Sequence, residues 1–135
     1  MPEPRVSVAL VTHAPLGSAL KVIAEHIYGE HVDLTVIDVL PGACAEKSTD
    51  SLLTRIKMID QGAGVLLLTD LPGASPANIC RSACDLAREM GVQCDVLAGV
   101  NASMVLRAMN HRAKGLSHAA EAALEGAKHP IGRVD

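Results

Sequence analysis

The hydrophobic residues of this chain change their spacing several times, and this alternation constrains the fold more than any other feature. Short apolar or β-branched segments at 6–11, 32–39, 65–68 and 92–100 have the character of β-strands. Between them, apolar residues recur every three or four positions, as on the buried face of an amphipathic helix. The segment at 65–68 is wholly apolar, which is typical of a central strand covered on both faces.

Helix starts can be placed from short polar side chains that suit the N-cap position. One helix is expected from Leu16 to Gly29, and four others begin at candidate N-caps, namely Ser48, Ser75 (followed by Pro76), Asn101 and Ser117. The resulting order, β-α-β-α-β-α-β-α-α, predicts an α/β fold with three α/β/α layers. We expect a mostly parallel central sheet with strand order 2-1-3-4 and room for an additional edge strand.

The length of 135 residues fits one domain. We expect that domain at 5–128, with an N-terminal extension at 1–4 and a loose C-terminal tail at 129–135. No apolar run reaches the roughly 18–20 residues that span a bilayer, and the N-terminus lacks a signal-peptide pattern. We therefore expect a cytoplasmic protein without membrane insertion, whose four cysteines are reduced core residues.

The composition excludes several kinds of partner. Phe and Trp are absent and Tyr28 is the only aromatic residue, which argues against stacking on single-stranded nucleic acid or on a flavin. The net charge of −3 argues against a surface that binds DNA phosphates. The chain also lacks the glycine motifs of nucleotide-binding loops, so we expect no nucleotide cofactor.

Two ionisable residues follow the strands that flank the expected reversal of strand order. His13 comes just after the first strand and Asp70 just after the third. Ligands of open α/β sheets bind at such a point, so we expect the two side chains to face one another. A carboxylate that accepts from one imidazole nitrogen fixes the tautomer and leaves the other nitrogen free to act as a nucleophile.

The segment after Asp70 contains a candidate anion site. Ser75 and the free N–H groups of 75–78 lie at a predicted helix start, where the helix dipole favours negative charge. Gly73 permits a turn that other residues resist, and we place Gly73 and Ala74 beside the same anion. A nucleophilic imidazole, an orienting carboxylate and an oxyanion site together predict phosphoryl transfer to His13, with no metal or other cofactor required.

Each of these residues also has a purely structural interpretation. His13 could be a loop residue, Asp70 a turn former and Ser75 only a helix cap. Their placement at one predicted switch point favours the functional interpretation.

Two further groups of residues are weaker candidates. Cys80 and Cys84, four positions apart, could share a metal ion, but no second pair has ligand spacing. A small basic cluster has the composition of a solvated helix end; its members are Arg107, Arg112 and Lys114.

Three segments resemble the mannose-type EIIA domain of the bacterial phosphotransferase system. They are V-A-L-V-T-H-A-P-L-G (8–17), G-V-L-L-L-T-D-L-P-G-A-S-P-A-N (64–78) and L-A-G-V-N-A-S-M (97–104), and the similarity runs from about Arg5 to Lys128. The resemblance implies a homodimeric α/β phosphotransferase component that accepts a phosphoryl group from phospho-HPr and passes it to an EIIB protein.

The resemblance also assigns roles to individual residues. His13 matches the phosphorylated histidine, whose Nε2 is the expected site. Asp70 matches the aspartate that hydrogen-bonds it, and Ser75 the serine near the phosphoryl oxygens. Asn101 matches the asparagine of the G-V-N segment, and we expect it and Thr12 to line the site.

The chain departs from the family in one segment, since an aromatic residue and Gly-Gly often precede Ser-Pro where residues 71–74 here read Leu-Pro-Gly-Ala. We expect a free-standing component with a separate EIIB acceptor, serving sugar uptake or regulation. Two alternatives stay open: a regulatory module whose binding is switched by phosphorylation of His13, and a phosphocarrier domain that serves a dihydroxyacetone kinase. A response-regulator receiver is not supported, because no acids flank His13.

Overall fold

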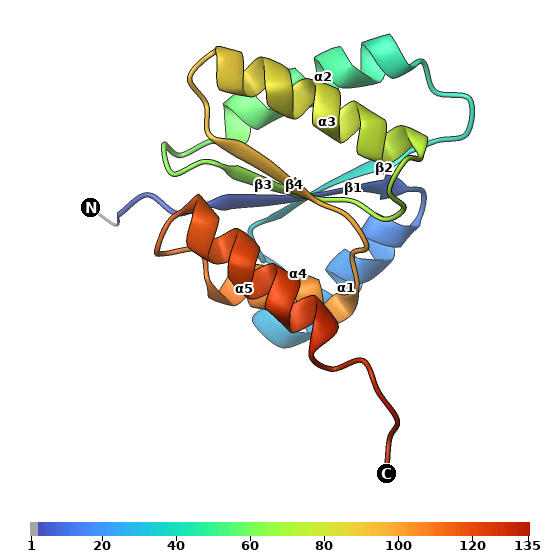
Figure 1. The fold of residues 1–135 in the computed structure, drawn as a ribbon, viewed down its shortest axis with the longest axis vertical. Helices are drawn as coiled ribbons and strands as arrows, with labels where there is room; N and C mark the ends of the chain where they lie inside the picture. Colours follow the sequence, from blue (N-terminus) through green and yellow to red (C-terminus); the bar gives the residue numbers. More distant parts are fainter. Residues whose placement is uncertain (1–2) are drawn as a thin grey trace.

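The computed structural model describes residues 3–135, in which a central sheet lies between two layers of helices (Figure 1). The sheet holds the strands β1 (Ser7–His13), β2 (Leu34–Val39), β3 (Val65–Leu68) and β4 (Cys94–Leu97). All three pairings are parallel, and the order is β2-β1-β3-β4. The predicted α/β/α architecture and strand order are confirmed, and no additional edge strand occurs within residues 3–135.

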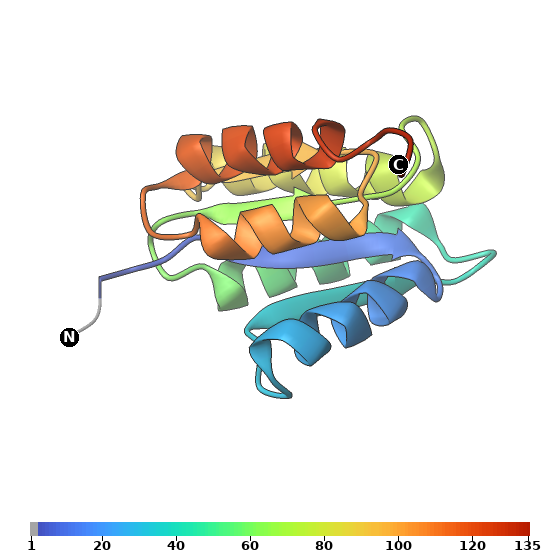
Figure 2. The same ribbon diagram turned by 90° about the horizontal axis from the view of Figure 1, so that it is seen from below.

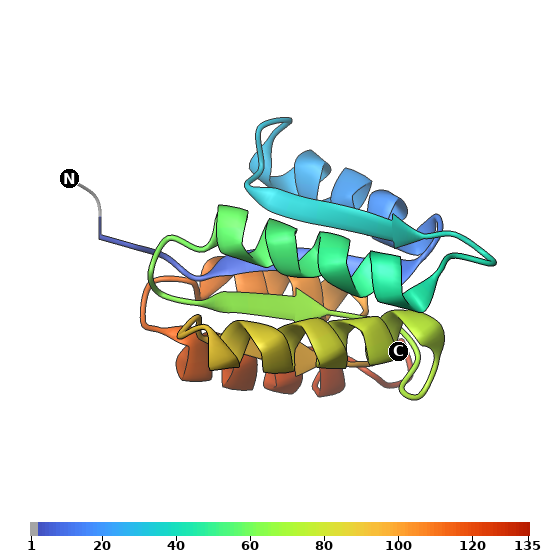
Figure 3. The ribbon, with the colours of Figure 1, turned by 90° about the horizontal axis from the view of Figure 1, so that it is seen from above.

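In the described part of the chain, five helices cover the two faces of the sheet. They are α1 (Leu16–Tyr28), α2 (Ala45–Ile59), α3 (Ser75–Glu89), α4 (Ala102–Asn110) and α5 (Leu116–Lys128). Helices α2 and α3 lie together on one face, as the view from above shows (Figure 3), and α1, α4 and α5 cover the other. None of these helices combines the length and apolarity needed to cross a bilayer.

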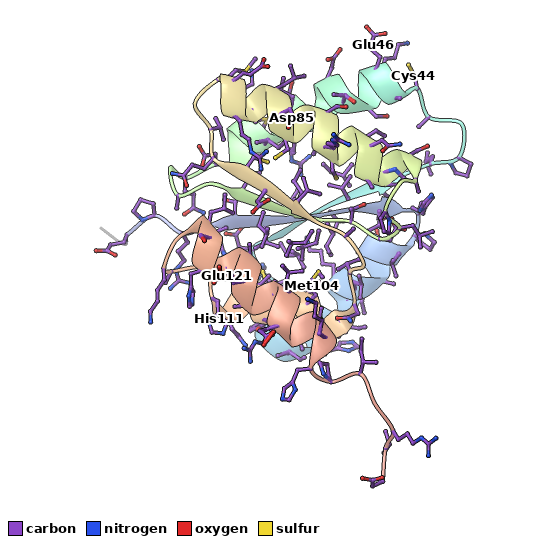
Figure 4. The ribbon with its side chains drawn as sticks, in the orientation of Figure 1. Cys44, Glu46, Asp85, Met104, His111 and Glu121 are labelled. Atoms are coloured by element: carbon purple, nitrogen blue, oxygen red, sulfur yellow. The ribbon has the colours of Figure 1, made fainter. Side chains whose placement is uncertain are left out.

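The two central strands are buried on both faces, which explains their continuous apolar character. In β3, Leu66 and Leu68 pack towards α1, α4 and α5, whereas Val65 and Leu67 pack towards α2 and α3. Successive side chains of a strand point to opposite faces of the sheet, and here helices cover both faces. Met104 reaches the first of these clusters from α4 (Figure 4).

Because every strand runs in the same direction, the carboxyl ends of β1, β3 and β4 meet at one edge of the sheet. The segments that lead into α1, α3 and α4 lie at this edge (Figure 2). The edge therefore gathers His13, Asp70 and Asn101 with three helix N-termini.

Three of the predicted N-caps lie inside the first turn of their helices instead. The N-caps of α2, α3 and α5 are Cys44, Ala74 and Gly115. The N–H of Ser48, for example, already donates to the carbonyl of Cys44 at 2.9 Å, so Ser48 is part of the helix. Asn101 is confirmed as a cap, since its side chain accepts from the N–H of Met104 at 2.9 Å.

Several predicted boundaries also differ from the structure. The strands expected at 32–39 and 92–100 are shorter, and the first strand extends to His13 because β2 pairs with it up to His13↔Val39. The extension expected at 1–4 falls partly outside the described residues. Cys44 is exposed beside α2 (Figure 4), so only the other three cysteines are the core residues expected.

Arg112 corrects the interpretation of the basic cluster as a solvated helix end. Its side chain is only 7% exposed. Its Nε donates to the carbonyl of Val6 at 2.6 Å, and its Nη2 donates to the carboxylate of Asp33 at 2.8 Å. Arg112 thus joins the α4–α5 connection to the residues that precede β1 and β2.

We predict that Arg112→Met lowers the free energy of unfolding by about 1–3 kcal/mol, because the carbonyl of Val6 loses a buried donor. Lys114→Met, at an exposed position two residues away, should stay within about 0.5 kcal/mol of the wild type. Urea denaturation of both variants measures the difference, and equal losses would contradict the structural role of Arg112.

Candidate functional site

The structure brings His13 and Asp70 together at the carboxyl edge of the sheet. The ring Nδ1 of His13 lies 2.7 Å from Oδ2 of Asp70, although the residues are 57 positions apart. The His13 side chain is 48% exposed and that of Asp70 only 12%. The carboxylate thus lies beneath an imidazole that an approaching molecule can reach.

The hydrogen bond determines which ring nitrogen is free. Burial favours the neutral form of Asp70, but hydrogen bonds from the His13 ring and from backbone N–H groups outweigh it and lower the pKa of the carboxyl. An ionised carboxylate only accepts hydrogen bonds, so Nδ1 of His13 carries the proton. Nε2 makes no hydrogen bond within residues 3–135, and in the neutral ring it holds the free lone pair.

The same carboxylate oxygen also holds the backbone of His13. Oδ2 of Asp70 accepts from the His13 N–H at 3.1 Å as well as from the ring. The other oxygen, Oδ1, is buried and has no hydrogen-bond partner among the described residues. The carbonyl of Asp70 accepts from the N–H of Gly99 at 2.6 Å, which fixes the loop after β3 against the loop after β4.

The start of α3 offers fewer donors than the sequence suggested. Ser75 is the first helical residue and is exposed, but its hydroxyl makes no capping bond. Pro76 has no N–H, and the N–H of Asn78 already donates to the carbonyl of Ala74 at 3.0 Å. Within residues 75–78, the N–H groups of Ser75 and Ala77 therefore remain for an anion at the positive end of the helix.

The turn that leads into α3 requires a glycine. Gly73 has φ of +82°, in the left-handed region that residues with a side chain rarely adopt. Ala74 follows in an extended conformation and directs the chain into the helix. Gly73 and Ala74 therefore place the start of α3, whereas direct contact of either residue with a phosphoryl group stays a prediction.

Asn101 follows β4 at the same edge of the sheet, and its side chain is engaged in the fold. Its Oδ1 caps α4, and its Nδ2 donates to the carbonyl of Ala127 at 3.0 Å. This pair of bonds ties the start of α4 to the end of α5. Asn101 thus positions the loop after β4. These two hydrogen bonds give Asn101 a structural role that does not depend on contact with a ligand.

Thr12 and Gly17 form a contact that sequence reasoning did not find. The hydroxyl of Thr12 accepts from the N–H of Gly17 at 2.8 Å and donates to the carbonyl of His13 at 3.1 Å. Thr12 was expected only to line the site, whereas it is fully buried beneath it. The spacing Thr-His-x-x-x-Gly was the available signal, but its meaning depends on how α1 packs against β1.

The other cysteine and histidine side chains make no hydrogen bond to His13 within residues 3–135. Cys80 and Cys84 are not part of a cluster of three or more His, Cys, Asp or Glu side chains suited to a metal within residues 3–135. Burial raises the pKa of the Cys80 thiol to about 12. His111 and His118 approach to 3.2 Å between Nδ1 and Nε2, but His111 follows the far end of α4 from Asn101 (Figure 4).

The chain matches the family model described as the PTS system fructose IIA component (EIIA-man) over residues 7–127. Among curated proteins, it is 30% identical over 107 residues to the PTS system mannose-specific EIIAB component of Escherichia coli (strain K12). That match covers 79% of this chain and 32% of the relative. The chain thus spans about a third of the length of the curated relatives it matches.

Solved structures show the same fold over almost the whole chain. A phosphotransferase system component EIIA from Streptococcus agalactiae has a TM-score of 0.82 at 21% identity, covering 95% of this chain and 96% of that one. A mannose/sorbose specific IIA subunit from Enterococcus faecalis has a TM-score of 0.77 at 19% identity, covering 97% and 96%.

The lowered pKa of Asp70 predicts how its contribution to stability depends on pH. Ionised Asp70 stabilises the fold above its ordinary pKa of 3.8, and this stabilisation is lost as the pH falls through the lowered folded-state pKa. The unfolding free energy of the wild type should exceed that of Asp70→Asn at pH 7, and the difference should shrink as the pH falls below the ordinary pKa of 3.8 and through the lowered pKa of the folded state.

Chemical denaturation across this pH range measures the effect. Asp50→Asn, on the exposed side of α2, removes a carboxylate without a side-chain hydrogen bond and serves as the control. A difference between wild type and Asp70→Asn that does not change with pH would contradict the assignment.

Proposed function

Because the chain belongs to the mannose-type EIIA family of the bacterial phosphotransferase system, whose components are phosphotransferase proteins, we propose that it is a phosphocarrier. His13 accepts a phosphoryl group from phospho-HPr and passes it to an EIIB protein. The observation that carries the proposal is the 2.7 Å contact between the His13 ring and Asp70, which leaves Nε2 as the nucleophile at an exposed position.

In the proposed reaction, the lone pair of Nε2 attacks the phosphorus atom held by the donor histidine. The bond from phosphorus to His13 Nε2 forms as the bond to the donor nitrogen breaks, and the electron pair of that bond stays with the donor ring. The His13 ring gains positive charge as it is substituted. The proton stays on Nδ1 of His13 and remains hydrogen-bonded to the Asp70 carboxylate. Asp70 thereby stabilises the positive charge without itself being protonated.

The phosphoryl oxygens are proposed to lie at the start of α3. The N–H groups of Ser75 and Ala77 and the Ser75 hydroxyl supply donors there, in the turn shaped by Gly73 and Ala74. Positioning and charge stabilisation account for the catalysis, since no other covalent step is required. Transfer to EIIB reverses the sequence, with the acceptor nucleophile attacking the same phosphorus.

The partners and the physiological setting are part of the proposal. We propose a cytoplasmic homodimer whose phosphocarrier domain spans 5–128, with HPr as donor and EIIB as acceptor. Sugar uptake and regulation both fit this chemistry. The regulatory module and the dihydroxyacetone kinase carrier are distinguished by the acceptor, because only the EIIA function discharges to EIIB.

We predict that phospho-HPr labels the wild-type chain with a phosphate that is labile to acid and stable to alkali, as expected of a phosphohistidine. His13→Ala should abolish the label. His111→Ala, which removes a histidine outside the candidate site, should keep it. Mass spectrometry and alkaline gel analysis of the labelled protein measure both outcomes.

Label that persists undiminished in His13→Ala would refute the assignment of the phosphorylated residue. Addition of a purified EIIB protein should then remove the label from the wild type. A labelled chain that no EIIB discharges, but that forms a phosphorylation-dependent complex with another protein, would favour the regulatory module instead.

We further predict that Asp70→Asn slows phosphoryl transfer more than it weakens docking. An asparagine can donate to Nδ1 and so favours the tautomer in which Nε2 carries the proton, which should reduce the maximal rate on the order of 10²-fold or more. Rapid-quench kinetics at several HPr concentrations separate the maximal rate from the apparent KM. A change confined to KM would assign Asp70 to docking.

A further inference from the structure

Thr12 is a buried polar residue whose hydrogen bonds converge on the proposed nucleophile. It is the penultimate residue of β1 and is 0% exposed. Its Oγ1 acts both as acceptor and as donor, because it accepts from the Gly17 N–H at 2.8 Å and donates to the His13 carbonyl at 3.1 Å. One hydroxyl thus bridges the last residue of β1 and the first turn of α1.

The helix that follows His13 has no cap of its own. The N-cap residue of α1 is Pro15, whose side chain cannot accept a hydrogen bond. The acceptor for the N–H of Gly17, the second residue of the helix, comes instead from Thr12, which precedes the helix by several positions. Thr12, a residue of β1, therefore accepts the hydrogen bond from the first turn of α1 that an N-cap side chain usually accepts.

Gly17 shows how closely the helix approaches this hydroxyl. A Cβ built at Gly17 would lie 3.1 Å from Thr12 Oγ1, 3.1 Å from Val36 Cγ1 and 3.3 Å from Asp38 Oδ1. A side chain at this position would force the neighbouring side chains to shift by a few tenths of an ångström. The hydroxyl of Ser18 also donates to the carboxylate of Asp38, so the first turn is attached to both β1 and β2.

The backbone of His13 is held on both sides by these contacts. Its N–H donates to Asp70 Oδ2, and its carbonyl accepts from Thr12 Oγ1. The imidazole projects from the Cα between the two fixed groups, while Asp70 holds its Nδ1. A shift of either group would change the direction in which Nε2 points.

We propose that Thr12 is a positioning residue for phosphoryl transfer, whose hydroxyl holds the His13 backbone and the start of α1 so that Nε2 faces the donor. This inference rests on the proposed function of His13. Thr12 does not touch the reacting atoms. Its effect should therefore appear in the rate of the chemical step and in the ring's hydrogen bond, and not in the affinity for the donor.

Two substitutions separate the hydroxyl from the methyl group. Thr12→Val keeps the shape and removes the hydrogen bonds, whereas Thr12→Ser keeps the hydroxyl. Thr12→Val should lower the maximal rate of His13 phosphorylation by about 10- to 100-fold with little change in the apparent KM, because small misplacements of a reacting group are costly. Thr12→Ser should stay within about threefold of the wild type.

Thr54→Val is the matched control, since Thr54 is also a threonine whose hydroxyl donates to a backbone carbonyl at 3.1 Å, but on α2. It should transfer at the wild-type rate. As a readout independent of transfer, nitrogen-15 NMR of the imidazole should show faster exchange of the Nδ1 proton of His13 in Thr12→Val. That exchange should stay unchanged in Thr12→Ser and in Thr54→Val.

Three outcomes would overturn the inference: a wild-type maximal rate in Thr12→Val, equal losses in Thr12→Val and Thr12→Ser, or a loss confined to KM. The proposed function fails separately, if the wild-type chain takes no phosphoryl group on His13. In that case the NMR comparison still decides whether Thr12 positions the ring. If Thr12→Val does not fold, Thr12→Ser provides the test. A maximal rate of His13 phosphorylation that falls more than tenfold in Thr12→Ser overturns the inference. A maximal rate near that of the wild type, with an unchanged Nδ1 signal, supports it.

Discussion

The hydrogen bond between His13 Nδ1 and Asp70 Oδ2 is the interaction on which the character of the site depends. It assigns the proton to one ring nitrogen and leaves the other free, and it places a carboxylate of lowered pKa beneath the ring. The two residues meet because β1 and β3 are parallel neighbours in the sheet, so that their carboxyl ends coincide. The register of two buried strands is therefore a requirement of the chemistry as well as of the fold.

That register is held by aliphatic packing on both faces of the sheet. A shift of one residue in β3 would exchange Leu66 and Leu68 with Val65 and Leu67 between the two core clusters, and would also move Asp70 away from His13. Around the site, bonds from loop to loop add further restraint, as between Gly99 and the carbonyl of Asp70. The buried core thus extends as far as Thr12, directly before the exposed imidazole of His13.

The juxtaposition of His13 and Asp70 could be predicted because it follows from strand order, which the alternation of apolar periods indicates. The details of the anion site could not, because they depend on individual bonds. Ser75 is a residue type that favours the N-cap position. In the structure, however, the N-cap is Ala74, whose carbonyl accepts the first hydrogen bond of α3. Arginine is usually a surface residue. Arg112 is buried because the chain before β1 brings the carbonyl of Val6 to its Nε, which the sequence pattern does not reveal. The bridge from Thr12 to Gly17 is likewise a consequence of tertiary packing.

Under the proposed function, the chain supplies an incomplete environment for the phosphoryl group. The start of α3 contributes the N–H groups of Ser75 and Ala77 and one hydroxyl, whereas a phosphoryl group presents three oxygens that each accept more than one bond. The imidazole is also nearly half exposed. We propose that the docked partner supplies further donors and excludes water from the phosphoryl group. This division makes transfer depend on docking, so that a donor or acceptor of the wrong shape would leave the phosphoryl group insufficiently stabilised.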